Sequence, residues 1–164
     1  MKQYTQQEID DLIRCPKVVT EAPRPSFKDE YRHRSNGFRV ATSDGEHRFR
    51  VFLRQSLEFV EDFSIGLLYE PKDGRSFLLV RFNGQHDIAI EGDDVRTHFT
   101  YHVHLAEAGR VNNGFYDSLP ARTTGDYASF NEALEAFFLR TGIPEPEKYF
   151  PDRVSLPLFR PREP

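Results

Sequence analysis

VRTHFTYHVHL, residues 95–105, alternates side chains with a period of two and holds three of the six histidines of the chain. In a strand with this pattern the side chains divide into an apolar set, Phe99, Tyr101, Val103 and Leu105, and a polar set, His98, Thr100, His102 and His104. One apolar and one polar face are typical of a sheet that packs on one side only. We therefore expect the histidines to lie on an open face, where their replacement by alanine would leave the fold intact.

The segments before this stretch predict the rest of the sheet. Apolar or alternating runs indicate strands at residues 38–42, 46–54, 62–70, 77–82 and 85–91. Asp44-Gly45 and Asn83-Gly84 supply the residue types of tight hairpin turns. Because strands joined by such turns pair antiparallel, the sequence predicts an α+β fold with a single antiparallel sheet of five or six strands in mostly meander order.

Two capping boxes predict the helices. Thr5-Gln6-Gln7-Glu8 begins a short amphipathic N-terminal helix that ends before Pro16, and Ser129-Phe130-Asn131-Glu132 begins a C-terminal amphipathic helix that ends at Gly142. The apolar stripe of the second helix runs from Phe130 to Phe138 and is expected to pack on one face of the sheet. Residues 16–36 and 106–127 show no periodicity and are interpreted as a connector and a long loop.

The composition indicates one domain, residues 1–143, followed by a Pro-rich extended tail, residues 144–164. Cys15 is the only cysteine, which excludes an intrachain disulfide. The N-terminus is polar, and no apolar run approaches the roughly 18 residues of a membrane span. We expect a cytoplasmic protein with no membrane partner.

The candidate catalytic residues are His102, His104, Arg81 and His98. Two imidazoles can act as base and acid near neutral pH, and an arginine can stabilise charge on phosphorane oxygens. Although the net charge is -4, arginines gather between residues 31 and 54, and three of them, Arg48, Arg50 and Arg54, share one face of a predicted strand. These three are the candidate ligand-binding residues. The resulting hypothesis is an anionic ligand, RNA first among candidates, and metal-independent, ribonuclease-like acid–base chemistry without a cofactor.

Two alternatives stay open. His102 and His104 lie two residues apart, about 6.6 Å between Cα atoms on a strand, which is a spacing that metal ligands use, with Glu107 as the third ligand. The other alternative is a non-catalytic protein-interaction module, such as a defence, counter-defence or toxin–antitoxin component. The sequence does not decide whether the protein is an enzyme. Nor does it assign a face to His86, because a one-residue bulge would reverse its direction.

Several short motifs follow one another along residues 5–143. They are a TxxE helix start at Thr5, an Arg-bearing strand (79–82), an Asn-Gly-x-His segment (83–86), an IEG turn (90–92), the His-x-His strand, and a helix that ends in Gly-Ile. In this order they resemble a family of small bacterial proteins of unknown function. The resemblance implies a bacterial or phage origin and carries no assigned activity.

Overall fold

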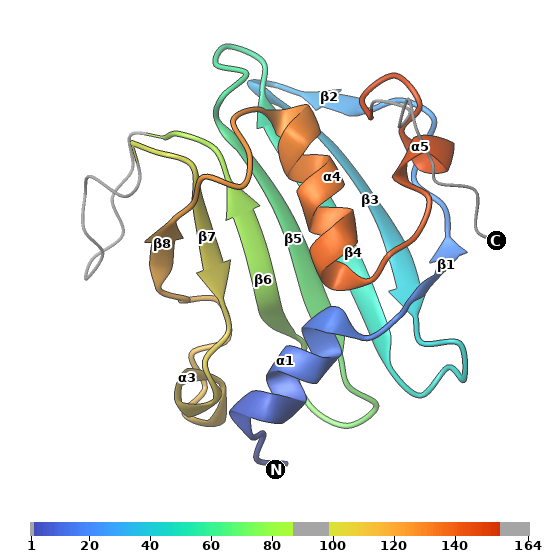
Figure 1. Ribbon diagram of the computed structural model, residues 1–164, viewed down its shortest axis with the longest axis vertical. Helices are drawn as coiled ribbons and strands as arrows, with labels where there is room; N and C mark the ends of the chain where they lie inside the picture. The colour runs from blue at the N-terminus through green and yellow to red at the C-terminus, as the bar shows by residue number, and fades with distance from the viewer. Residues whose placement is uncertain (1, 87–98, 155–164) are drawn as a thin grey trace, which may run out of the picture.

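Antiparallel strands form the centre of the molecule, for which a computed structural model describes residues 2–86 and 99–154. Within these residues the sheet has eight strands in the order β1-β3-β4-β5-β6-β7-β8, and β2 pairs with the other end of β3 (Figure 1). The strands are β1 (Val18–Glu21), β2 (Lys28–Glu30), β3 (His33–Ala41), β4 (Arg48–Ser56), β5 (Phe63–Glu70), β6 (Phe77–Asn83), β7 (His102–Leu105) and β8 (Ala121–Thr123). The α+β class and the antiparallel sheet are thus confirmed.

The number of strands differs from the five or six expected. β1 and β2 lie in the predicted connector, and β8 lies in the predicted loop together with the short helix α3 (Ala108–Asn112). These strands have only three or four residues, too few to show a period in the sequence, and the backbones of β3 and β7 supply their pairing. The predicted strand 85–91 lies mostly outside the described residues, as do residues 95–98 of the predicted histidine strand. Residues 99–101 are described but are not part of a strand, so β7 begins only at His102.

Both predicted helices begin at their capping boxes. α1 (Gln6–Arg14) has reciprocal hydrogen bonds between Thr5 and Glu8, of 3.1 and 2.8 Å. α4 (Phe130–Thr141) starts at Ser129 and ends at Gly142, whose φ of 66° is the left-handed conformation that glycine adopts readily. A further helix, α5 (Pro146–Tyr149), lies where the prolines predict an extended tail.

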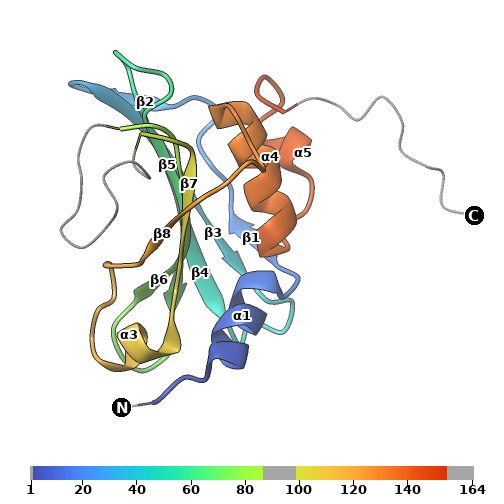
Figure 2. The same cartoon turned by 60° about the vertical axis from the view of Figure 1, so that its left-hand side comes forward.

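The helices α1, α4 and α5 cover the same face of the sheet (Figure 2). The apolar stripe of α4 packs on the central strands: the ring centroids of Phe130 and Phe63 lie 5.3 Å apart, and those of Phe137 and Phe82 lie 5.6 Å apart. Phe150, which follows α5, is buried against Phe38. The hydrophobic core therefore lies between the helices and one face of the sheet, and the other face is called the far face below.

A buried lysine joins the C-terminal ends of α1 and α4. Lys17 is only 2% exposed, and its Nζ donates hydrogen bonds to the carbonyl oxygens of Ile13, Cys15 and Thr141 at 2.8, 2.9 and 2.7 Å. Carbonyls at helix ends carry partial negative charge, so the ammonium group satisfies both helices at once. Burial lowers the pKa of Lys17 from its ordinary 10.5 to about 8.

We expect Lys17→Met to lower the free energy of unfolding by roughly 3 kcal/mol or more, because three buried carbonyl groups lose their donor. Between pH 8 and pH 10.5 folded Lys17 has released its proton while unfolded Lys17 still holds it. The contribution of Lys17 to stability therefore rises with pH across this range. Urea unfolding of both proteins at several pH values measures the two effects. Lys72→Met, which removes an exposed ion pair with Glu46, is the matched control, and an equal loss in both variants would contradict this role.

Candidate histidine and arginine site

Strand register brings the predicted catalytic residues together on the far face. Arg81 of β6 lies directly opposite His104 of β7, and Asn83 lies opposite His102. Directly opposite residues in an antiparallel pair point to the same side of the sheet. Next to them, the ring of Phe52 lies over Gly66, where a Cβ atom would be 2.3 Å from the ring, so any other residue at this position would have to displace the Phe52 side chain. The predicted grouping of Arg81, His102 and His104 is therefore present.

Their exposure differs from the sequence-based expectation. The side chains of His102 and His104 are fully buried, at 0% exposure, so the histidines do not line an open face. Nδ1 of His102 lies 2.8 Å from the carbonyl oxygen of Thr100, and Nδ1 of His104 lies 2.7 Å from that of Leu119. The alternation in the sequence predicted on which face of the strand the histidines lie. It could not predict that other segments, such as the one around Leu119, would cover them. Replacement by alanine would leave buried space and unpaired carbonyls, so we expect it to destabilise the fold, in contrast to the expectation from the sequence.

The hydrogen bonds assign a tautomer to each buried histidine. A carbonyl oxygen only accepts, so Nδ1 carries the proton in both rings and Nε2 of the neutral ring is the acceptor. Nε2 of His104 lies 3.3 Å from Nη2 of Arg81, which is always a donor. Nε2 of His102 lies 3.2 Å from Nε2 of His86, which is the donor when both rings are neutral. Each buried histidine thus accepts from a different side chain.

His86 is a site residue that the sequence left unassigned. Its ring centroid lies 5.0 Å from that of His102. A Cβ atom at Gly84 would come within 1.7 Å of the carbonyl oxygen of Glu61, so only glycine fits two residues before His86. The Asn-Gly-x-His motif was the signal in the sequence, but it did not show on which side of the sheet His86 lies. His98 lies outside the described residues.

We call Arg81, His86, His102 and His104 the histidine cluster. His102 and His104 form its buried interior, with ring centroids 5.1 Å apart, whereas Arg81 and His86 are partly exposed.

Tyr127, which precedes α4, holds the end of the cluster in place. Its buried hydroxyl lies 3.0 Å from the carbonyl oxygen of Asn83 and 2.7 Å from that of His102, and the two acceptors share its single hydrogen. It thereby links the ends of β6 and β7, and burial raises the pKa of Tyr127. Nothing in the sequence pattern indicated this role.

The three predicted ligand-binding arginines lie on the far face, but at different distances from the cluster. Arg54 belongs to a row of opposite residues that continues through Ser64 and Asn83 to His102. Three strand spacings separate Arg54 from His102, about 14 Å. Arg50 lies further along β4 and pairs with Glu70 at 3.6 Å, and Arg48 lies opposite Glu70 at the end of the strand. Of the three, Arg54 is the closest in register to the cluster.

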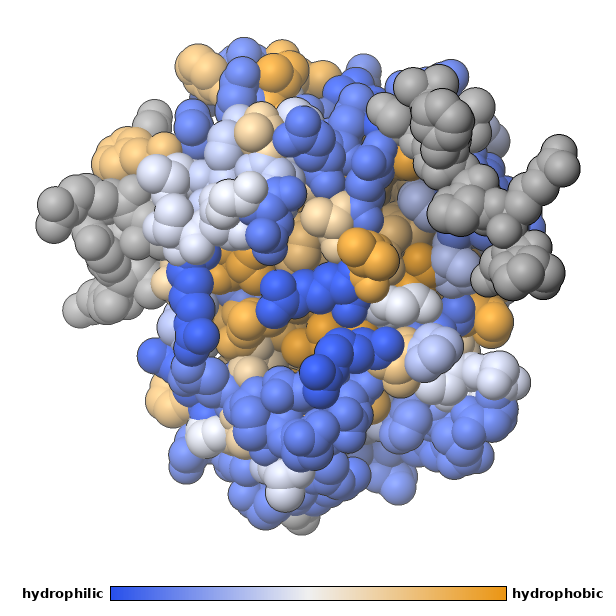
Figure 3. Space-filling model, in the orientation of Figure 1, coloured by the Kyte–Doolittle hydropathy of each residue, from blue (hydrophilic) through white to orange (hydrophobic). Residues whose placement is uncertain are grey.

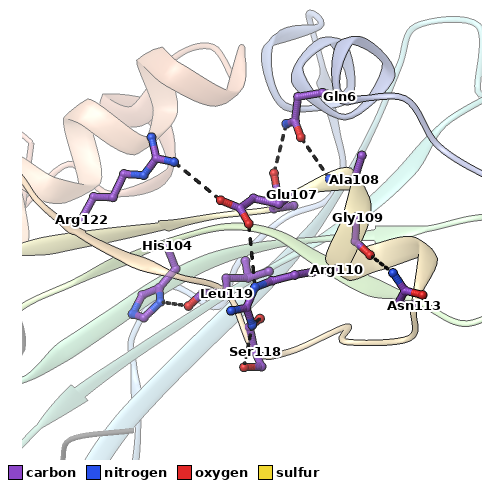
Figure 4. Close-up of polar contacts among 11 residues, drawn as sticks. Gln6, His104, Glu107, Ala108, Gly109, Arg110, Asn113, Ser118, Leu119 and Arg122 are labelled. Carbon is purple, nitrogen blue, oxygen red and sulfur yellow. Dashed lines mark hydrogen bonds and ion pairs between the residues drawn. The ribbon is translucent and has the colours of Figure 1, made fainter. Parts of the chain in front are cut away.

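The structure does not bring Glu107 to the histidines as a third metal ligand. Its carboxylate lies 3.8 Å from Arg110 and 3.6 Å from Arg122, while His104 contacts Leu119 (Figure 4). Within residues 2–86 and 99–154, no group of three or more His, Cys, Asp or Glu side chains is arranged to hold a metal ion. The guanidinium of Arg81 beside Nε2 of His104 also places a positive charge where a metal ion would bind.

A groove of about 920 Å³ lies on the helix side, between α1, α4 and the end of β7. Figure 3 shows apolar surface here between strongly hydrophilic residues. Gln6 fixes one wall, because its side-chain amide bonds to the backbone of Ala106 and Ala108 at 3.1 and 3.0 Å (Figure 4). The groove is lined by Gln6, Asp10, Ile13, Arg14, residues 105–109, Arg122, Leu139 and Arg140.

None of the helices among the described residues is long and apolar enough to cross a membrane.

Comparison with known proteins gives no relative from which a function could be transferred. No protein-family model matches the chain, and no curated protein and no solved structure is significantly similar to it. The resemblance seen in the order of motifs therefore stays a prediction, and function has to be inferred from the geometry of the chain itself.

Proposed function

We propose that the protein binds an anionic ligand at the histidine cluster and catalyses metal-independent proton transfer on a phosphodiester, with RNA as the first candidate substrate. The observation that carries this proposal is the pair of Nε2 contacts, from His86 to His102 and from Arg81 to His104. They leave two chemically complementary groups, a cation and an imidazole, on the partly exposed side of one cluster.

In this proposal the buried histidines position the reactive groups. His104, held by the Leu119 carbonyl, accepts from Arg81 and fixes the direction of its guanidinium. His102, held by the Thr100 carbonyl, accepts from Nε2 of His86 and leaves Nδ1 as the basic nitrogen of His86. A base that is oriented by a second buried acceptor follows the general logic of catalytic triads.

The chemistry follows from these positions. His86 takes a proton from the attacking hydroxyl at Nδ1, and the hydrogen bond from its Nε2 to His102 stabilises the imidazolium that forms. Arg81 contacts the non-bridging phosphate oxygens, where negative charge increases in the transition state. The protonated His86 then returns the proton to the leaving oxygen, directly or through a water molecule that relays it, and becomes neutral again. No metal ion is needed for any of these steps, and Arg54 contacts a neighbouring phosphate.

Separate His86→Gln and Arg81→Gln variants test the assignment. We expect each to reduce cleavage of a fluorescently labelled single-stranded RNA by roughly a hundredfold or more, because each removes a group that acts in the transition state. Arg75→Gln, at an exposed ion pair with Asp117, is the control and should keep its activity. The rate should be unchanged by a chelator. Absence of cleavage by the parent protein, or full activity of His86→Gln, would remove the catalytic proposal.

Binding is tested separately from cleavage by its dependence on salt. We expect the affinity of the His86→Gln protein for single-stranded RNA to fall as salt rises, because phosphate contacts release counterions. Arg54→Gln, added to this background, should reduce the slope of log affinity against log salt by about 0.7, the value for one lost phosphate contact on a single strand. Fluorescence anisotropy measures both. An affinity that is insensitive to salt would exclude an electrostatic interface.

The groove supports a second candidate, a protein-interaction module that takes an acidic amphipathic segment of a partner. Leu139 is 86% exposed beside the buried Ile13, which makes an apolar contact available at the rim. Arg14, Arg122 and Arg140 line the groove against two acidic residues, Asp10 and Glu107. Glu107 is shared between Arg122 and Arg110, so the lining keeps a positive balance that favours a partner with negative charge.

A synthetic amphipathic helix of leucine and glutamate is the probe for the groove. We expect it to bind the parent protein, and Arg140→Glu or Leu139→Asp to weaken binding at least fivefold, because the first reverses a rim charge and the second places a charge against the apolar contact. The same helix with lysine in place of glutamate should not bind. Equal binding of both helices, or no effect of the substitutions relative to Arg75→Glu, would reject this use of the groove.

A further inference from the structure

Two arginines from distant parts of the chain meet on the helix side of the sheet, on the face opposite the histidine cluster. Arg34 belongs to β3, and Arg153 lies in the turn after α5, near the first turn of α4 (Figure 1). Their Cζ atoms lie 5.5 and 4.5 Å from the ring centroid of Phe27, and Arg153 also lies 5.3 Å from that of Phe130. The two guanidinium groups therefore share one aromatic wall.

Neutral groups hold Arg34 in this position. Its Nε and Nη2 both donate to Oε1 of Gln55, at 3.0 and 2.6 Å, and Nε2 of Gln55 in turn donates to the carbonyl oxygen of Val60 at 2.8 Å. Gln55 itself is buried. The amide fixes the direction of the guanidinium but leaves its positive charge uncompensated. A preorganised cation of this kind loses little conformational entropy when an anion binds.

Neither arginine is neutralised by an ion pair. In the part of the chain that the structure describes, no carboxylate lies within 4.0 Å of the guanidinium nitrogens of Arg34 or Arg153. Burial, and then the nearby charge of Arg34, lowers the pKa of Arg153 against the smaller opposite effect of the Asp152 carboxylate. Two half-buried positive charges close to each other repel, and an anion bound between them would relieve this repulsion. The pair therefore favours the binding of an anionic ligand.

Both arginines line the same two hollows, of about 450 and 270 Å³. Asn131, at the start of α4, lines both as well and adds an uncharged hydrogen-bonding side chain. The carboxylates of Asp29, Glu61 and Asp152 also reach these hollows, but they belong to exposed residues and can keep their hydration. The space is sufficient for a phosphate group together with part of the molecule that carries it.

We propose that Arg34 and Arg153 form a binding site for the phosphate group of a small ligand. Arginine forks match tetrahedral oxyanions by donating parallel hydrogen bonds, and two forks from different directions can contact different oxygens. Arg34 retains Nη1 for this purpose while Gln55 holds its other two nitrogens. Phe27 provides an apolar surface beside both guanidinium groups. The site is independent of the proposed catalysis on the far face.

Titration with inorganic phosphate tests the proposal. We expect phosphate to raise the melting temperature of the full chain and to bind in calorimetry at constant ionic strength, with the dissociation constant increased at least tenfold in Arg153→Gln and in Arg34→Gln. Arg75→Gln should bind as the parent does. Ribose 5-phosphate should bind at least as tightly as phosphate, and acetate should not compete, which separates a phosphate site from a carboxylate site.

Arg34→Lys covers the case in which a glutamine variant does not fold. It keeps the positive charge but loses the fork and the double contact with Gln55, so we expect weaker phosphate binding with a native circular dichroism spectrum. Phosphate binding that is equal in the parent, Arg34→Lys and Arg153→Gln would overturn the site, as would an equal loss in Arg75→Gln. Stronger competition by acetate than by ribose 5-phosphate would overturn the assignment to phosphate.

Discussion

The packing of the α4 stripe on the central strands is the interaction on which the rest of the structure depends. Phe130, Phe137 and Phe138 are almost completely buried, and each such ring contributes about 1.5–3 kcal/mol relative to an exposed one. Because α1, α4 and α5 all lie on this side, apolar side chains are drawn to one face of the sheet. The polar residues of the same strands must then find their partners on the other face.

The histidine cluster follows from this division. Alternation along β6 and β7 directs Arg81 and His104 away from the helices, and register places them opposite each other. Buried imidazoles need partners for both nitrogens, since an unpaired polar group in the interior is costly. The carbonyls of Thr100 and Leu119 satisfy one nitrogen of each ring, and Arg81 and His86 satisfy the other. The hydrogen bonds that satisfy the buried rings therefore also set the direction of the partly exposed side chains of Arg81 and His86.

The helix side of the sheet has open regions with charged side chains, because the helices do not cover all of the strands. Between α1 and α4 an open groove remains over the end of β7, and beyond the start of α4 the arginine pair packs on Phe27. Lys17 connects the ends of the two helices between these regions. The helices therefore bury the core and also leave gaps between them. Their positions decide where charged side chains, such as those of Arg34 and Arg153, come close to one another.

The sequence by itself determined the fold class and much of the layout. Capping boxes at Thr5 and Ser129 specified both main helices, and alternation with tight turns specified the antiparallel strands from β3 to β6, because these signals act over a few residues. Alternation also placed His102 and His104 on one face of their strand, whereas the register between β6 and β7 placed Arg81 beside them. Only tertiary structure decided that these histidines are buried, that His86 joins them, and that Lys17 and Arg153 have their present partners. Burial and the choice of hydrogen-bonding partner depend on contacts between segments far apart in the chain, and no local pattern encodes them. The short strands β1, β2 and β8 were missed for the same reason, because pairing with a neighbouring strand defines them and their own sequence does not.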